Sequence, residues 1–371
     1  MARVTVRTLA DALGISVSTV SNAYNRPDQL SSELRARILS KADELGYAGP
    51  DAAARALRSG RAEAVGVVLT EQLSYAFSDP YAIGFLTGLC EVVEQRHISI
   101  VLMPLSFEGD ELDVTAVRHA KIDALTTFRL SDAHPAVTVA KARGIRLVLS
   151  DASADPNSSW VAIDDAGGGR LLGSHLASLG HENVAVIVDT TRPAGSVAFE
   201  LSDDEVGFVG YASRIRGIRE TLSGRIRLVS GGHNATASGR SAGRWLLTQP
   251  DHPTAIVALS DVLALGVLEA AAELGIQVPR DVSVCGFDDI PAAEATGLTT
   301  VRQPIRERGR RVGQLLIDPE SRDRQILLPI ELIVRSSTGP STGSGRRPST
   351  SSGRTVTRSG HKAALRRDQG T

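Results

Sequence analysis

Short apolar runs alternate with helically periodic segments from residue 63 to about 288, and this alternation most narrowly limits the possible folds. Each run has the length of a buried parallel strand, and strands that alternate with helices favour a parallel sheet covered by helices. The expected strands are 65–69, 98–103, 123–128, 146–150, 183–188, 226–229, 255–259 and 283–287. They fall into two successive series, which predicts an α/β fold with two doubly wound subdomains and a cleft between them.

The first 47 residues have a different pattern, with three short helical segments that each follow a hydroxyl residue. Thr5, Ser16 and Ser31 can cap these helices, because their side-chain oxygens can accept free N–H groups of the first turn. Gly14 and Gly46 can end the first and third helices. A helix, a tight turn and a second helix form the helix-turn-helix arrangement, whose second helix enters the DNA major groove.

The second segment, 17–25, carries small polar residues on the face that Val20 and Ala23 leave outward. Hydroxyl side chains suit phosphate contacts, and the amide of Asn22 can pair with adenine through two hydrogen bonds. A three-helix subdomain with an ordinary polar surface remains the alternative. Further along, the alanine-rich segment 52–57 has helix propensity but is too short to be helical alone in water.

Several motifs resemble those of the lac repressor family, in the same order and at the same distances. They are TVRTLADALGISVSTVS at 5–21, ELGY at 44–47, PDAAARALR at 50–58, RIRG at 214–217, GFDD at 286–289 and LTTVRQP at 298–304. The resemblance covers the chain through Thr338. It implies a sequence-specific transcription regulator, most often a repressor, that binds a palindromic operator as a homodimer and responds to a small-molecule effector.

The resemblance also implies which residues contact DNA. They are Thr5, Val17, Ser18, Thr19, Ser21, Asn22, Asn25, Tyr47, Ala53 and Leu57. In the family, segments like 52–57 from two chains fold together in the minor groove, and a leucine at the place of Leu57 wedges between base pairs. Without DNA, the same segment would serve as a flexible linker. Asn22 stands where the lac repressor has arginine, so we expect a preference for adenine over guanine there.

For the effector, the resemblance implies contacts from the cleft between the subdomains. The candidates are Ser78, Tyr81, Phe85, Asp151, Arg214, Asn234 and Asp261. A guanidinium at 214 and a carboxylate at 261 could bracket the vicinal hydroxyls of a sugar or nucleoside, or could form a structural ion pair. Asp165 and 288–289 are expected to serve packing at the crossover. In the family, the place of Asn234 is often held by an aromatic residue that stacks on the effector. An effector stacked at this side of the cleft is therefore less expected here.

These observations divide the chain into four parts. The expected parts are a DNA-binding head (1–47), a hinge and linker (48–62), an effector-binding domain (63–338) and a disordered tail (339–371). Within the third part, subdomain one is expected at 63–160 and 291–319, and subdomain two at 161–290 and 320–338. The head and tail are basic and the middle is acidic, since residues 1–61 carry nine basic against six acidic residues and 337–371 seven against one. This pattern indicates that an anion binds at the ends, and ordinary solvated basic surfaces are the alternative.

Other classes of protein fit the sequence less well. A periplasmic binding protein needs an export signal, which the first residues do not have, and no apolar run is long enough to span a membrane. Cys90 and Cys285 have no metal-ligand spacing and are expected to be buried, reduced thiols of a cytoplasmic protein. An enzyme, a cofactor and a metal site are not expected, because no nucleophile–base pair or histidine cluster stands out. The tail has no apolar heptads for a helical tetramer, which favours the dimer.

Overall fold

The head is a three-helix unit with its own small core. The computed structural model describes residues 4–49, 60–70, 73–108, 111–190, 192, 194–321 and 323–342. Within the first range lie α1 (Val6–Leu13), α2 (Val17–Asn25), the 3-10 turn η1 (Pro27–Gln29) and α3 (Ser32–Leu45). The side chains of Thr5, Ser16 and Ser31 accept hydrogen bonds from their first turns, and Gly14 and Gly46 end α1 and α3 in left-handed conformation, as the sequence predicts.

The first lobe of the body is a six-stranded parallel sheet with strand order β14-β7-β6-β5-β1-β2. Its strands are β1 (Ala64–Leu69), β2 (Ser99–Pro104), β5 (Ala124–Thr127), β6 (Arg146–Leu149), β7 (Ser159–Ile163) and β14 (Gln325–Leu328). Its helices are α5 (Pro80–Val93), α6 (Thr115–His119), α7 (Pro135–Ala142) and α13 (Ile305–Ile317), with the turns η2 (Leu73–Phe77) and η3 (Glu94–Arg96). A small hairpin, β3 (Ser106–Glu108) and β4 (Glu111–Asp113), lies between β2 and α6.

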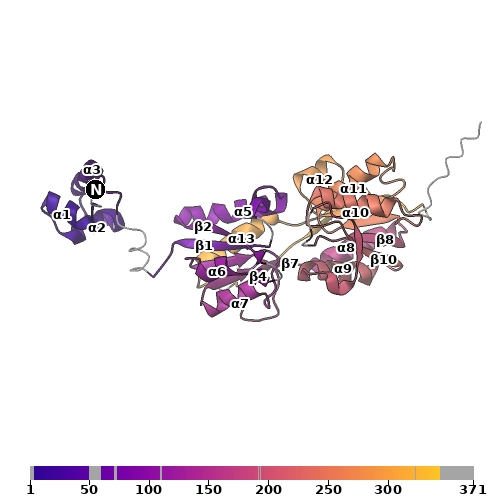
Figure 1. Ribbon diagram of the computed structural model, residues 1–371, viewed down its shortest axis with the longest axis horizontal. Helices are drawn as coiled ribbons and strands as arrows, with labels where there is room; N and C mark the ends of the chain where they lie inside the picture. The colour runs from indigo at the N-terminus through magenta and orange to yellow at the C-terminus, as the bar shows by residue number, and fades with distance from the viewer. Residues whose placement is uncertain are drawn as a thin grey trace, which may run out of the picture.

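The second lobe is built around a seven-stranded sheet with strand order β15-β13-β12-β11-β8-β10-β9. Its strands are β8 (Asn183–Ile187), β9 (Phe199–Leu201), β10 (Arg225–Ser230), β11 (Ala255–Ala258), β12 (Ser283–Asp288), β13 (Thr299–Arg302) and β15 (Glu331–Ile333). The edge strands β9 and β15 are antiparallel to their neighbours. The helices are α8 (Asp165–Ser178), α9 (Val209–Thr221), α10 (Thr236–Leu247), α11 (Asp261–Glu273) and α12 (Pro291–Ala295), with the turn η4 (Asp203–Glu205). Figure 1 shows the two lobes and the segments that join them.

The α/β fold with two mainly parallel sheets confirms the expected class, but the chain passes between the lobes at other places than expected. Strand β13 pairs with β12 in the second lobe, so the segment after residue 291 does not return to the first lobe until α13. Strand β14 pairs with β7 in the first lobe, although 320–338 was expected in the second. These strands are short, and their partners lie far away in sequence, so local pattern carries no information about which sheet they join.

The C-terminal boundary also differs from the expectation. Residues 339–342 were assigned to a disordered tail, yet the carbonyl of Gly339 lies 3.0 Å from the Nε2 of His181 and its N–H donates to Ser283. The N–H of Ser341 donates to the carbonyl of Leu179. Residues 343–371 lie outside the described part of the chain. The expected tail therefore begins no earlier than residue 343.

The described residues also bear on membrane-spanning helices, on the two cysteines and on metal binding. None of the described helices is long and apolar enough to cross a membrane. Both cysteines are free, and Cys285 is buried as expected, but Cys90 is exposed on α5. Within the described ranges, no group of three or more histidine, cysteine or acidic residues is placed to hold a metal ion.

Glycines let pairs of helices approach to backbone contact in both lobes. A β-carbon on Gly309 of α13 would lie 2.0 Å from the carbonyl oxygen of Phe85 on α5. In the second lobe, a β-carbon on Gly169 of α8 would lie 2.0 Å from the carbonyl oxygen of Arg214 on α9. The glycine-rich start of α8 thus serves close helix packing, and this contact positions Arg214 against the lobe.

Substitution of Gly217 by alanine is expected to destabilise the second lobe by about 1–3 kcal/mol, the usual cost of overpacking. The reason is that the new β-carbon would lie 2.0 Å from the carbonyl oxygen of Ala166, so α8 and α9 would have to separate. The midpoint of thermal unfolding measures the effect, with Gly207→Ala as the control because no atom lies within 4 Å of a β-carbon there. Equal midpoints for the two variants would contradict the packing argument.

Candidate functional site

The exposed face at the start of α2 is the candidate DNA-reading surface of the head. Val17 is 41% exposed, and Ser18 and Asn25 are also exposed. The side chains of Thr19, Ser21 and Asn22 are half-buried along the same helix. Val20 and Ala23 are fully buried beneath it, as the sequence predicts. An apolar methyl group and small hydroxyls at a helix start suit thymine methyl groups and phosphates.

Hydrogen bonds within the head hold several of these polar side chains in place. The hydroxyl of Ser16 lies 2.7 Å from the hydroxyls of both Ser18 and Thr19. The amide of Asn22 donates to the side chain of Gln29 at 3.3 Å, and the amide of Asn25 donates to the hydroxyl of Ser21 at 3.0 Å. The candidate base-reading amide is therefore oriented by η1, the turn that follows the helix.

Two predicted DNA contacts take structural roles. Thr5 caps α1 through a reciprocal pair of hydrogen bonds with Thr8. The ring of Tyr47 is buried in the head core and packs edge-on against Tyr24, with ring centroids 5.9 Å apart. The ring of Tyr47 therefore stabilises the head core, and its predicted contact with DNA stays a prediction. Ala53 and Leu57, the predicted hinge contacts, lie outside the described residues.

A cavity of about 390 Å³ lies between the two lobes of the body. Aromatic residues from both lobes line it, namely Tyr75, Tyr81, Phe128, Phe208 and Tyr211. Its charged lining residues are Arg129, Asp132, Asp151, Asp165, Arg214, Asp288 and Arg308. Many of them follow the carboxyl ends of strands, the edge at which open parallel sheets bind ligands. The size and the mixed lining are those of a small-molecule site.

Four of the seven predicted effector residues line this cavity, namely Tyr81, Asp151, Arg214 and Asn234. The other three do not. Phe85 is fully buried in the core, where its ring packs against Phe128 with centroids 4.6 Å apart. Ser78 is exposed and donates its hydroxyl to the carbonyl of Ser74. Phe85 lies on α5 and Ser78 just before it, and neither residue lines the cavity.

Asp261 is the third residue for which the predicted effector contact is wrong. Its side chain is fully buried, and its two oxygens accept from the hydroxyl of Thr300 at 2.6 Å and from the N–H of Ile290 at 2.9 Å. Burial raises the pKa of Asp261 to about 6, against the hydrogen bonds that lower it. The carboxylate therefore joins α11 to the strand β13 and the start of α12.

The ion pair of Arg214 forms with Asp165, which the sequence assigned to crossover packing. The Nε of Arg214 donates to Asp165 at 2.8 Å, and its Nη1 donates to the carbonyl of Leu259 at 2.8 Å. The guanidinium also lies 3.5 Å from the ring centroid of Phe287. Asp165 and Asp288 both line the cavity, so the expectation that they serve only packing is corrected.

Burial raises the pKa of two carboxyl groups in the cavity. The pKa of Asp151 is raised by burial, which outweighs the nearby Arg308 guanidinium 3.8 Å away. The pKa of Asp288 is raised well above its usual range by burial and then by Asp261. Buried carboxyl groups that resist ionisation are well suited to hydrogen bonds with a polar ligand that carries no charge.

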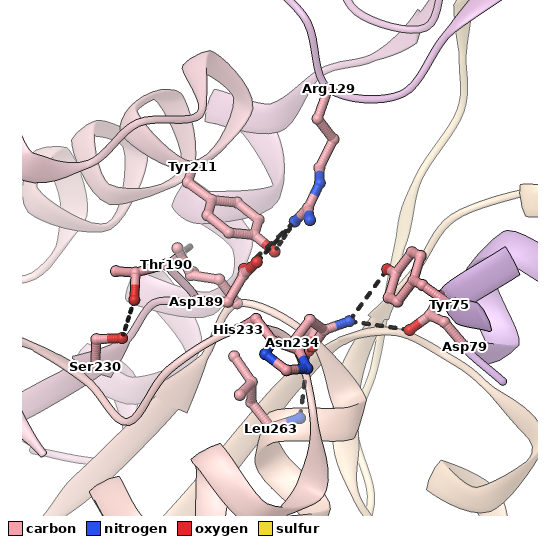
Figure 2. Close-up of polar contacts among 12 residues, drawn as sticks. Tyr75, Asp79, Arg129, Asp189, Thr190, Tyr211, Ser230, His233, Asn234 and Leu263 are labelled. Atoms are coloured by element: carbon pink, nitrogen blue, oxygen red, sulfur yellow. Dashed lines mark hydrogen bonds and ion pairs between the residues drawn. The ribbon is translucent and has the colours of Figure 1, made fainter. Parts of the chain in front are cut away.

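Several lining residues were missed at the level of sequence. Arg129 follows β5 and Tyr211 lies on α9, and both face a carboxylate, Asp189, that follows β8 (Figure 2). Their positions after strand ends could have marked Arg129 and Asp189 as candidates. Arg308 lies inside α13 and donates to the hydroxyl of Tyr81 at 2.7 Å, and no local signal distinguishes it from the other arginines of that helix.

A helix-turn-helix head on a two-lobed α/β body with a cavity between the lobes defines a DNA-binding regulator with a periplasmic-binding-protein-like body. The family model of the periplasmic binding protein-like domain matches residues 174–338. The chain is 36% identical to an HTH-type transcriptional regulator of Mycolicibacterium smegmatis, over 91% of this chain and 97% of that protein. The chain belongs to the LacI family of helix-turn-helix transcriptional regulators.

Solved structures of LacI-family regulators share the fold. A regulator from Corynebacterium glutamicum is 27% identical with a TM-score of 0.66, over 91% of this chain and 100% of that one. The transcriptional regulator CelR in its complex with cellobiose is 25% identical with a TM-score of 0.62, over 90% of this chain and 100% of that one. The similarity therefore spans both the head and the body.

Proposed function

We propose that this protein is a repressor that binds a palindromic operator as a homodimer and is controlled by a neutral sugar or nucleoside-like effector in the lobe-junction cavity. The observation that carries the proposal is the cavity, which takes aromatic and hydrogen-bonding side chains from both lobes. A ligand held by both lobes binds differently when their angle changes, and this difference is what control by an effector requires.

The head supports the DNA-binding part of the proposal. One head presents one short helix face, with Val17 and Ser18 at its start and Asn22 further along, and reads only a few base pairs. Two heads related by a two-fold axis read both halves of a palindrome, and a dimer doubles the phosphate contacts. Asn22 is the candidate for adenine recognition. A role as an enzyme is not proposed, because the relatives are transcriptional regulators.

The chemistry of the cavity supports a ligand rich in hydroxyl groups. Each of the three arginines has a carboxylate within 4.0 Å: Arg129 has Asp189, Arg214 has Asp165 and Arg308 has Asp151. Carboxyl oxygens of Asp151 and Asp288 remain as acceptors for ligand hydroxyls. Asn234 is not aromatic and cannot stack on a ligand. The rings of Tyr75 and Tyr211 offer faces on which a sugar or base could stack instead. Cellobiose, the ligand of the CelR complex, is a neutral sugar.

A thermal-shift screen of neutral sugars and nucleosides tests the effector assignment, since a ligand at 100 times its Kd stabilises the native state by about 2.7 kcal/mol. Asp151→Ala is expected to weaken the binding of the identified ligand by about tenfold or more, because a buried ligand hydroxyl is left without its hydrogen-bond partner. Asp203→Ala, on the surface of the second lobe, is the matched control. Unchanged affinity in Asp151→Ala would contradict the placement of the ligand, and an identified ligand that leaves operator binding unchanged would contradict the regulatory role.

A further inference from the structure

Two side chains cross between the lobes beside the cavity, and they do so in opposite directions (Figure 2). Arg129 follows β5 of the first lobe, and its Nη1 donates to the two carboxylate oxygens of Asp189 in the second lobe at 3.3 and 3.2 Å. The same nitrogen donates to the hydroxyl of Tyr211, also in the second lobe, at 2.8 Å. The side chain of Asp189 is fully buried.

The second crossing runs from the second lobe to the first. Asn234 follows β10, and its Nδ2 donates to Asp79 at 3.0 Å and to the hydroxyl of Tyr75 at 3.4 Å. Asp79 is itself buried and caps α5 by accepting the N–H of Ala82. The hydroxyl of Ser260 donates to the other end of the Asn234 amide at 2.5 Å, so the side chain is held at both ends.

Arg129 is held in place more firmly than a surface ion pair would be. Its guanidinium lies 4.1 Å from the ring centroid of Phe208 and 5.4 Å from that of Tyr211, both in the second lobe. Its backbone has a φ of 53°, a left-handed conformation that residues other than glycine rarely adopt. The N–H of Arg129 donates to the hydroxyl of Ser150 at 3.2 Å, which fixes this turn. Strained backbone of this kind is retained where it positions a functional side chain.

We propose that Arg129–Asp189 and Asn234–Asp79 form a two-point clasp that sets the angle between the lobes. Arg129 and Asn234 are positioning residues, because they act through the lobe angle. Opening the cleft separates Arg129 from both its carboxylate and its two aromatic rings, so the clasp favours the closed arrangement. A ligand that requires the closed arrangement binds only the closed molecules. Its apparent affinity therefore falls as the fraction of open molecules rises.

The lobe distance in the full-length chain tests the clasp directly. Dyes attached through Lys121→Cys in the first lobe and Thr248→Cys in the second, in a Cys90→Ser background, report the distance by energy transfer. An excess of unlabelled chain ensures that no dimer carries two labelled copies. Arg129→Ala and Asn234→Ala are each expected to shift the population toward larger distances. Arg219→Ala is the matched control, since Arg219 pairs with Asp203 inside the second lobe and is expected to change nothing.

Chemical rescue separates the clasp from a general loss of folding. Ethylguanidinium has the atoms that Arg129→Ala removes beyond the β-carbon, so millimolar concentrations are expected to restore the wild-type distance in that variant. Asn234→Ala should not respond, and sodium chloride at the same ionic strength should not substitute. Unchanged distances in both Arg129→Ala and Asn234→Ala would overturn the proposal. The proposal would also be overturned if ethylguanidinium did not restore the wild-type distance in Arg129→Ala.

The clasp also has a consequence for regulation, which rests on the proposed function and is measured as operator affinity. If the lobe angle controls the head, Arg129→Ala changes effector-free operator affinity by at least about fivefold, the lower end of usual allosteric coupling. A changed distance with unchanged operator affinity would support the clasp and overturn the link from the lobe angle to DNA binding. The clasp and the proposed function can thus fail separately.

Discussion

A fragment that begins at Arg61 is expected to lose at least about 10³-fold in operator affinity while it still binds the effector. Sequence-specific binding exceeds nonspecific binding by about this factor or more, and the fragment has no head. The body is also acidic between residues 62 and 336, with 25 basic against 35 acidic residues, so its own field repels DNA.

The structure indicates where the fragment should begin and why it should fold. The cores of the two lobes contain no head residue among the described residues, and the head has its own core. Asp123 accepts the N–H groups of Ala62 and Glu63 at 2.7 and 2.8 Å, so a start at Arg61 keeps both hydrogen bonds. Fluorescence anisotropy with operator DNA and a shuffled duplex measures the loss. A fragment that still prefers the operator would contradict the assignment of DNA reading to the head.

Asp261→Ala is expected to destabilise the second lobe by about 2–4 kcal/mol, because it leaves two buried hydrogen-bond donors without an acceptor. These donors are the hydroxyl of Thr300 and the N–H of Ile290. Asp261→Asn has nearly the same shape and keeps one acceptor, so its loss should be smaller. Thermal or denaturant unfolding of the three proteins measures the difference. If Asp261→Ala unfolds like the wild type and loses only its ligand, Asp261 is an effector residue after all.

The pH dependence of stability gives a second measure of the same buried carboxyl. The folded pKa of Asp261 is raised to about 6 from 3.8, so the native state binds its proton more tightly than the unfolded chain. The stability that this proton contributes is fully present below about pH 4 and is lost as the pH rises through 6. The wild type should therefore gain stability relative to Asp261→Asn on acidification from pH 7 to 5. A difference between them that is independent of pH would show that Asp261 titrates normally.

Local features of the head and body could be predicted from sequence because short-range forces decide them. Hydroxyl caps, left-handed glycines and alternating apolar runs act over a few residues, and the structure has them where the sequence predicts them. Arg214 and Asp151 were found because the family motif and the strand end both mark the cavity edge. Residues 51–58, which carry the predicted hinge, lie outside the described residues, and that prediction stays open.

The sequence by itself determined the class of fold, the helix-turn-helix head and four of the seven predicted cavity residues. Tertiary structure alone decided that β13 and β14 join different lobes, because sheet pairing depends on partners far along the chain. It also decided that Arg214 pairs with Asp165 and that Asp261 faces the protein interior. A carboxylate after a strand end can face a ligand or the chain itself. Only the packing of distant segments around it sets which of the two it faces.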